Sequence, residues 1–518
     1  MTLFKKKNIV ILLFIIVFFL LGFFLLQWWA KNYVTDLLSQ KLPPQFALKY
    51  SDLDINILSG DAILYQTELK IKSNDTLQNH TFLKLESLEL NGIGYWDLMF
   101  NETLSIKNIH LKHPKLHYYP YKKIASNKSE SKAKKKGIKT IKFDELNIAN
   151  GSLDVMKQST DSVKLSVKSY NLKVSGSKID LNSETKRPFA FEDYNLNAKN
   201  IILGNNEYET IKISSVNTNK DVWQLENLQI APKYDKQELS RHLSKERDYI
   251  NLNIPRVILK SLTFNFFEDP FTITVASTEI VEPNLEIYRD KLLPDDLTFK
   301  PLYSKSLRTL TFDLAIKQTE IKNGYISYAE LVEPDKKAGK IFFNKVDATL
   351  KHLTNVKNAE KTDIKIHSEL MGEAPLELNW SFDVNNTSDT FEISGAIQNL
   401  PANVLNPFFK PNLNALAEGT LQQMYFTFYG NNVTSEGEIK MKYDDFKFNL
   451  LRQNSSKINK VLTAIGNIFV SGDSKTNDEG FRFGDIEAER DTTKSFFNYL
   501  WINVKSGLVS TLTGNGEK

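Results

Sequence analysis

After the first fifty residues, apolar side chains recur at every second position of the chain. The alternation is clearest in Leu53–Ile57, Leu83–Leu90, Lys164–Val167 and Ile364–Ile366. Because successive side chains of a strand point to opposite faces of a sheet, this period predicts strands with one buried face and one wet face. A parallel α/β sheet would instead show continuous apolar strands between amphipathic helices, and only Gln237–Arg247 has the pattern of such a helix. We therefore expect a mainly β fold built on antiparallel strands.

A short glycine-containing unit recurs along this β region. In the unit, two alternating apolar residues and two spacers precede a glycine, and two further alternating apolar residues follow it. The unit occupies Ile55–Leu64 and Leu146–Val155, and more loosely Ile321–Tyr328. We expect its glycine to adopt the positive φ that a tight turn or bulge between strands requires.

A second signature accompanies the first at a matching distance. Leu111–Tyr119 matches Ile280–Tyr288 in its apolar positions, its proline and its final tyrosine. The two prolines are 169 residues apart, and the glycines of the first signature, Gly151 and Gly324, are 173 residues apart. Two markers that return in the same order at nearly the same offset predict an internal duplication of roughly 170 residues. Chance recurrence of common β patterns is the alternative.

The N-terminal region contains a long apolar segment. Ile9–Leu26 is an unbroken apolar run of 18 residues, and a helix of about 20 such residues crosses the hydrocarbon core of a bilayer. Lysines precede the run and tryptophans follow it, so we expect an uncleaved single-pass anchor with the N-terminus in the cytoplasm. A buried core helix and a cleaved signal peptide are the alternatives. The expected membrane-interface residues are Lys5, Lys6, Lys7, Trp28 and Trp29.

The net charge of +4 is concentrated in two short segments. The three N-terminal lysines contribute +3 and residues 122–142 contribute +8, so the remainder of the chain carries −7. A nucleic-acid binder would spread lysine and arginine along one face of its fold, so we expect no nucleic-acid partner. The Lys-rich stretch at 122–137 has almost no apolar residue and is predicted to be a disordered loop. Contact of its lysines with anionic lipid is the alternative.

The C-terminal segment is predicted to form an amphipathic helix. Asp491 and Thr492 are its candidate N-cap residues, and Asn503 falls largely on its polar face. We expect the helix to pack as a lid over the end of the sheet, with docking on a membrane or a partner protein as the alternative. Its apolar face comprises Phe497, Leu500, Trp501, Val504, Leu508 and Leu512.

The sequence contains little that indicates chemistry. The absence of cysteine excludes disulfides, thiolate catalysis and thiolate metal sites. Three histidines lie close together, but their segment alternates like a strand, so His110 is expected to point away from His113 and His117. There is no phosphate-binding glycine loop, nucleophile elbow or His-Glu-x-x-His motif. We expect no catalytic residues, no metal or cofactor site and no enzymatic activity.

Segments near both ends of the chain share the motif order of a known family. An anchor leads into a short strand and a glycine at the N-terminal end, and glycine-started strands lead to a tyrosine-aspartate strand and a closing helix at the C-terminal end. The segments are Tyr50–Ile55 with Gly60, Phe391–Ile397, Gly419–Leu421, Gly437–Phe446 and Arg490–Trp501. In this order the chain resembles the AsmA-like family of bacterial inner-membrane-anchored periplasmic proteins, and the tail is similar to that of Bacteroidota-type members.

The resemblance implies an elongated sheet curled into a hydrophobic groove, anchored in the inner membrane with its bulk in the periplasm. Family members are implicated in phospholipid movement toward the outer membrane and in envelope integrity, so phospholipids or other acyl lipids are the expected ligands. An uncovered apolar strip on such a sheet would bind something apolar, and a closed β-sandwich is the alternative. The candidate lining residues are Leu53, Ile55, Ile57, Leu146, Ile148, Leu153, Val155, Ile326 and Tyr328.

The expected organisation is an anchor at 1–30, a repetitive β body at 31–350, an AsmA-like β region at 351–490 and a helix with a tail at 491–518. The leading functional expectation is a non-enzymatic protein that binds or conducts acyl chains for outer-membrane lipid homeostasis. The alternative is an envelope scaffold that binds a protein partner through a sheet edge or the C-terminal helix.

Overall fold

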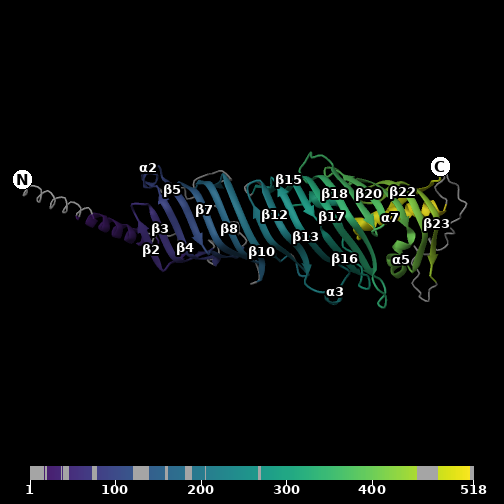
Figure 1. Ribbon diagram of the computed structural model, residues 1–518, viewed down its shortest axis with the longest axis horizontal. Helices are drawn as coiled ribbons and strands as arrows, with labels where there is room; N and C mark the ends of the chain where they lie inside the picture. Colours follow the sequence, from purple (N-terminus) through teal and green to yellow (C-terminus); the bar gives the residue numbers. More distant parts are fainter. Residues whose placement is uncertain are drawn as a thin grey trace, which may run out of the picture. The chain divides into compact units, whose positions relative to one another are not determined.

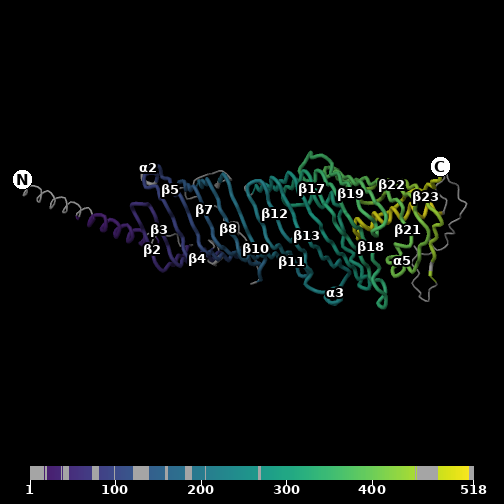
Figure 2. The backbone as a smooth tube through the Cα atoms, viewed as in Figure 1, coloured from purple at the N-terminus to yellow at the C-terminus, as the bar shows by residue number. Residues whose placement is uncertain are grey.

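The computed structural model describes residues 17, 20–36, 38, 46–72, 79–120, 139–157, 162–180, 189–204, 206–265, 270–451 and 477–513. These residues form a mainly β fold, in which 24 strands belong to one large sheet (Figures 1 and 2). The expected fold class is confirmed at this level. The sheet is mixed rather than purely antiparallel, because β5 and β6 run parallel to β7, and β15 and β16 run parallel to β17.

The chain divides into two compact units. Unit 1 comprises residues 1–205 and 213–220, and its strands follow one another in the sheet largely in chain order, from β1 and β2 through β8 to β10 (Figure 1). Its elements are β1 (Phe46–Lys49), β2 (Asp52–Asn56), β3 (Asp61–Lys72), β4 (Asn79–Ile93), α2 (Tyr95–Phe100), β5 (Thr103–Lys112), β6 (Lys115–Tyr118), β7 (Thr140–Met156), β8 (Val163–Asp180), β9 (Phe189–Ala190) and β10 (Asp193–Leu203).

Unit 2 comprises residues 206–212 and 221–518, and β11 (Glu209–Thr218) contributes residues to both units. Its strands are β12 (Val222–Pro232), β13 (Asp248–Lys260), β14 (Thr263–Asn265), β15 (Thr272–Val281), β16 (Asn284–Asp290), β17 (Asp313–Leu331), β18 (Gly339–Thr354), β19 (Thr362–Leu370), β20 (Ala374–Phe382), β21 (Phe391–Pro401), β22 (Ala415–Gly430), β23 (Thr434–Leu450) and β24 (Arg482–Glu489). The sequence boundary proposed at 350/351 falls inside β18.

The helices of unit 2 are short apart from the last one. They are α3 (Lys236–His242), α4 (Tyr303–Arg308), the 3-10 turn η1 (Ala402–Leu405), α5 (Asn406–Leu413) and α7 (Phe496–Thr513). The helix expected near Gln237–Arg247 is present in part as α3, which ends at His242. The side chain of Asp235 caps it by accepting a 2.7 Å hydrogen bond from the backbone N–H of Glu238.

The two sets of parallel strand pairs, one in each unit, have the same local structure. In unit 1, β4 is antiparallel to both β5 and β6, which run parallel to β7; in unit 2, β13, β15, β16 and β17 have the same relations. Pro114 and Pro283 occupy the break between the paired short strands. Their carbonyl groups accept hydrogen bonds from the N–H groups of Ser152 at 2.7 Å and Tyr325 at 2.8 Å. This equivalence of pairing supports the duplication that the sequence predicts.

The recurring glycines play a different role from the one expected at two of their three positions. Gly60 has a φ of 73°, but in β7 and β17 the left-handed residue is the preceding asparagine, with a φ of 53° at both Asn150 and Asn323. Gly151 is required instead for close approach, because a Cβ atom there would lie 2.5 Å from Cζ of Tyr170. Asparagine tolerates the left-handed conformation better than most residues, so it can form the bulge itself.

Two clusters of buried apolar residues lie within the described part of the chain, and other residues such as Ile106 and Phe143 are buried outside them. In unit 1, Leu53, Ile55 and Leu64 form a small cluster against residues 34 and 38 of the N-terminal segment. In unit 2, a large cluster on β18 to β24 packs against residues of α7 and the neighbouring short helices, including Leu302. Both clusters form where a helix covers one face of the sheet.

The N-terminal segment forms a helix over residues 20–36. No helix among the described residues is long and apolar enough to span a membrane. Most of the apolar run Ile9–Leu26 lies outside those residues, as do Lys5, Lys6, Lys7 and the predicted loop at 122–137.

Candidate functional site

One face of unit 1 carries three rows of apolar side chains that cross the sheet from β4 to β10. Residues paired in register across neighbouring strands point to the same face, so each row can be followed through the strand pairing. The rows are Leu90, Ile109, Leu146, Val174 and Tyr194; Leu88, Leu111, Ile148, Leu172 and Leu196; and Leu83, Leu116, Leu153, Val167 and Ile201. We call these residues the open apolar face.

The third row lies an odd number of residues from the second, which in a regular strand would put it on the other face. Left-handed residues between the rows, including His113, Asn150 and Asn200, interrupt the alternation. In β1 and β3, the pair Leu48 and Leu69 lies at the level of the third row, and Leu48 still packs against the Leu53 cluster. The packing of Leu48 against the Leu53 cluster supports placing the third row on the same face as the other two.

The opposite face of the same strands carries a row of polar side chains. Glu89, His110, Asn147, Lys173 and Asn195 are cross-strand neighbours in a single row. A 2.6 Å hydrogen bond from Lys112 holds the pKa of Glu89 below its usual range despite the opposing effect of partial burial. This row is thus polar, whereas Ile106 and Phe143, four residues earlier in β5 and β7, are buried at 5% exposure.

The open apolar face lacks the burial of a packed core. Fourteen of its fifteen members are only half-buried, and Val174 alone is buried, at 7% exposure. Among the described residues of unit 1, the N-terminal helix packs against the cluster of Leu53, Ile55 and Leu64, where Leu53 falls to 1% exposure. Leu88 of β4 also packs against this cluster, and the other members of the rows present an apolar surface that extends beyond it.

Unit 2 contains equivalent rows that begin in the same way. Leu285 pairs with Ile326 and Ile326 with Phe343, which corresponds to the pairing of Leu116 with Leu153 in unit 1. Tyr328 is half-buried beside Ile326, and desolvation raises the pKa of its hydroxyl, which also hydrogen-bonds Glu330.

Toward the C-terminus the rows become covered by α7, which lies against β23 and β24 (Figure 1). Ile393 and Ile486 have 0% exposure beneath it. Gly507 of α7 makes this contact possible, because a Cβ atom there would lie 2.7 Å from Ile439 and 2.8 Å from Ile486. The ring of Phe496 stacks on Trp380 with 4.5 Å between centroids. Here the same kind of apolar face is closed.

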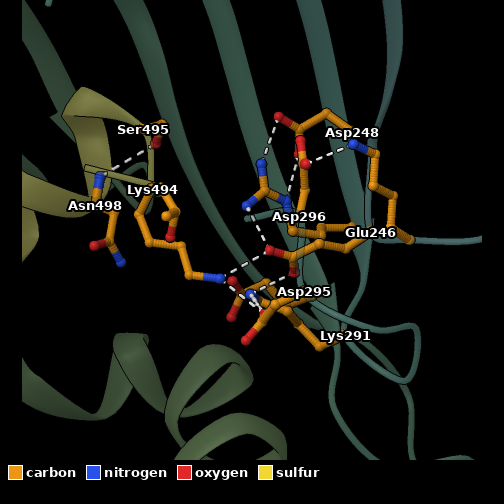
Figure 3. A network of polar contacts seen from close by, with 12 residues as sticks. Glu246, Asp248, Lys291, Asp295, Asp296, Lys494, Ser495 and Asn498 are labelled. Atoms are coloured by element: carbon orange, nitrogen blue, oxygen red, sulfur yellow. Dashed lines mark hydrogen bonds and ion pairs between the residues drawn. The ribbon is translucent and has the colours of Figure 1, made fainter. Parts of the chain in front are cut away.

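A polar clasp holds the chain that leads into α7 (Figure 3). We define it as Glu246, Lys291, Asp295 and Lys494. Lys291 donates to Glu246 at 2.6 Å, and Lys494 donates to both Glu246 at 3.0 Å and Asp295 at 2.8 Å. The N–H of Lys300 also donates to the carbonyl of Thr492 at 2.8 Å. The clasp fixes the N-terminal side of α7 to the loops beside β13 and β16.

The charges of the clasp support one another. Burial alone would raise the pKa of Glu246, but hydrogen bonds from Lys291 and Lys494 outweigh it and hold that pKa below its ordinary value. Burial likewise opposes the charge of Lys494, yet Asp295 and Glu246 raise its pKa. Glu246 and Lys494 are 248 residues apart, so no local sequence signal indicated this contact.

The predicted lining residues occupy different environments. Leu146, Ile148 and Leu153 belong to the open apolar face, and Val155 continues its pattern by pairing with Leu165. Ile326 and Tyr328 lie in the equivalent rows of unit 2. Leu53 and Ile55 are buried under the N-terminal helix, and Ile57 packs against the same cluster. The interfacial candidates Trp28 and Trp29 are exposed.

The buried face of α7 is displaced from the predicted stripe. Leu500, Val504, Leu508 and Leu512 pack against the large cluster, but Phe497 is 60% exposed and Trp501 42% exposed. Phe496 and Tyr499 are buried instead.

Asn503 was expected on the polar face and is fully buried. It accepts a 2.7 Å hydrogen bond from Ser435 and donates to the carbonyl of Tyr499 at 2.9 Å. The helix begins at Phe496, so Asp491 and Thr492 are not its caps; the side chain of Ser495 accepts from the N–H of Asn498 at 3.3 Å. Satisfied hydrogen bonds allow a polar residue to face the core, which an apolar pattern cannot reveal.

The remaining polar features do not converge on a reactive centre. His113 pairs with Glu86 at 2.8 Å, and His117 with Asp154 at 3.4 Å, each across its own strand pair. The described residues contain no cluster of three metal-ligating side chains. An open pocket of about 830 Å³ on unit 2 is lined by carboxylates that include Glu392, Glu436 and Glu487, which suits neither an acyl chain nor a phosphate.

Comparisons with protein-family models and with curated protein sequences found no match.

Proposed function

We propose that the protein is a membrane-anchored, AsmA-like lipid-binding protein whose open apolar face contacts lipid acyl chains. The observation that carries the proposal is the half-burial of the three rows in unit 1, set against the full burial of similar side chains beneath α7. Apolar surface of this extent favours an apolar ligand, because leaving it in water costs about 25 cal/mol per Å². Acyl chains are long, flexible and without polar atoms, so they match rows that run across many strands.

The proposed location rests on the sequence. The apolar run Ile9–Leu26, the preceding lysines and the following tryptophans favour a single pass through the inner membrane with the bulk in the periplasm. The resemblance of both chain ends to the AsmA-like family favours a role in outer-membrane lipid homeostasis and envelope integrity.

Site-specific photocrosslinking tests the lipid contact. Benzoylphenylalanine replacing Ile148 lies on the open apolar face, and the same group replacing its neighbour Asn147 lies on the polar face of the same strand. After purification in mild detergent and irradiation, mass spectrometry should find lipid adducts at position 148 and not at 147. Equal labelling at both positions, or adducts at neither together with no co-purifying lipid, would refute the proposal.

A second candidate function is an envelope scaffold, which the exposed aromatic pair on α7 favours. Phe497 and Trp501 lie one helical turn apart and expose large apolar surface, and such residues frequently anchor protein interfaces. Replacing both with serine should remove a captured envelope partner and leave lipid adducts at position 148 unchanged. Retention of the partner together with unchanged lipid adducts would argue against a scaffold role for this aromatic pair.

A further inference from the structure

We propose that α2 and the turn after β2 form a second membrane contact, which inserts apolar side chains into the bilayer interface beside the N-terminal helix. This inference rests on the membrane anchorage proposed above and adds a distinct surface to it. The surface consists of Leu58, Trp96 and Phe100, which we call the interfacial patch.

The three residues of the interfacial patch are large, apolar and highly exposed. Leu58 is 80% exposed, Trp96 71% and Phe100 63%. The rings of Trp96 and Phe100 lie together, with 4.4 Å between centroids, so they present one aromatic surface. Tyr95 beside them is also exposed. Grouped exposed aromatics are characteristic of surfaces that bind a membrane or a partner.

Two contacts fix the direction of the N-terminal helix relative to β2. Lys31 forms a 3.1 Å ion pair with Asp52, and the side chain of Gln27 donates a 2.6 Å hydrogen bond to the carbonyl of Ile55. The helix and the strand therefore run in opposite directions. Continuing along the chain from Ile55 to Leu58 leads toward helix residue 26 and the end of the apolar run. Leu58 thus lies near the level of Leu26, where the apolar run ends and the expected membrane interface begins.

Hydrogen bonds to backbone N–H groups place α2 at the same end of unit 1 as the turn after β2. The carbonyl of Gly60 accepts a 2.8 Å hydrogen bond from the N–H of Ile93, and the side chain of Asp61 accepts from the N–H of Gly92 at 3.1 Å. α2 begins two residues after Ile93. Figure 1 shows α2 at the end of the unit that carries the N-terminal helix. The turn after β2 and α2 are therefore neighbours on one rim.

The chemistry of this rim favours a lipid surface over a protein partner. The described helix residues leading toward it expose Leu21, Phe24 and Leu25, so the interfacial patch continues an apolar surface that already includes the proposed anchor. Tryptophan prefers the headgroup level of a bilayer because its ring is apolar and its N–H is polar. Lys107, exposed beside Gly92, supplies a cation that suits anionic headgroups.

Single-cysteine labelling of the full-length chain tests the inference, because the chain has no native cysteine. The variants Leu58→Cys and Trp96→Cys would carry an environment-sensitive fluorophore, with Phe100→Cys replacing Trp96→Cys if that variant does not fold. Trp28→Cys reports on the anchor, and Lys168→Cys, exposed on β8, is the control. Each protein is reconstituted into vesicles of phosphatidylethanolamine and phosphatidylglycerol.

We expect the labels at 58 and 96 to shift their emission to the blue and to be quenched by lipids that carry a nitroxide near the headgroup, with no change at 168. Quenching at 28 without quenching at 58 and 96 would overturn the inference and leave the anchorage standing. A concentration-dependent blue shift without lipid quenching would assign the patch to a second copy of the chain. Failure at all sites, with the protein not floating with vesicles, would instead defeat the anchorage itself.

Discussion

The open apolar face of unit 1 and the covered face beneath α7 have the same local sequence pattern but differ in burial. Leu146-Asn147-Ile148 in β7 and Ile439-Lys440-Met441 in β23 both alternate apolar, polar, apolar. Leu146 and Ile148 stay half-buried, while Ile439 and Met441 are each 1% exposed. The difference comes from the layer above the strands, so the sheet pattern sets which face is apolar and the helices decide where that face is closed.

The largest effect should come from removing the central ring of the covered face. Phe496→Ala deletes a side chain that stacks on Trp380 and packs against Phe391, and should lower the free energy of unfolding of this region by about 4 kcal/mol. The adjacent Phe497→Ala removes an equally large ring that is exposed, so it should cost less than about 1 kcal/mol. Denaturant unfolding, with hydrogen exchange of β23 and β24 as the local readout, measures both. Equal losses would mean that α7 does not cover the cluster as described.

A matched pair of isoleucines tests the comparison directly. Ile393→Ala beneath α7 should cost about 3 kcal/mol, because it leaves a cavity in a packed core. Ile148→Ala on the open apolar face should cost only about 1 kcal/mol in lipid-free protein, since little surface is removed from contact there. Unfolding of the two variants in the same denaturant series gives the ratio. A large loss at position 148 would show that a layer covers the open face.

The polar clasp should make closure of the C-terminal region depend on pH. Hydrogen bonds from Lys291 and Lys494 hold the pKa of Glu246 below its ordinary value of 4.5. Its contribution to stability is therefore present above about pH 4.5 and is lost as the pH falls through the lower pKa of the folded state. Glu246→Gln should cost about 2 kcal/mol near neutral pH, because it removes the buried carboxylate that Lys291 and Lys494 share and leaves them only the more exposed carboxylate of Asp295 within the clasp. The variant should also flatten the acid dependence. Thermal unfolding from pH 7 to pH 3 checks both effects, and unchanged acid dependence in the variant would remove the clasp from this role.

A small effect on stability should accompany a clear loss of ligand in the last variant. Leu153→Gln places an amide on the open apolar face, where the side chain is half-buried and water can solvate it, so the stability loss should stay near 1 kcal/mol. Lipid recovered with the purified protein should fall relative to wild type and to the control Lys168→Gln. Unaltered lipid content would place the acyl chains elsewhere.

The period-two alternation predicted the mainly β fold because strand geometry ties it directly to sequence. The pairs formed by Pro114 with Pro283 and by Gly151 with Gly324 predicted the duplication, and the repeated parallel strand pairs agree with it. The parallel pairing of β5 and β6 with β7, and of β15 and β16 with β17, was not predicted. The residues of these short strands alternate as those of antiparallel strands do, so they do not indicate the direction of the partner.

The covered regions resisted prediction for a different reason. Whether Leu53 or Leu153 is buried depends on a helix distant in the sequence, and Lys494 reaches Glu246 across 248 residues. The face of α7 was misplaced because Asn503 is buried through its hydrogen bonds and Gly507 through its lack of a side chain. Neither residue contributes to a hydrophobic stripe.

The strand order within each unit has a mechanical consequence. Most strands pair with their neighbours in the chain, so pulling on one end would peel strands away one after another instead of shearing the whole unit at once. The helix over β2 and β3 and the helix over β23 and β24 cover strands near the two ends of the strand series, where such peeling would start. Each helix would have to detach from its cluster before the first strand could separate. Resistance to an applied force would therefore be greatest near the two terminal helices.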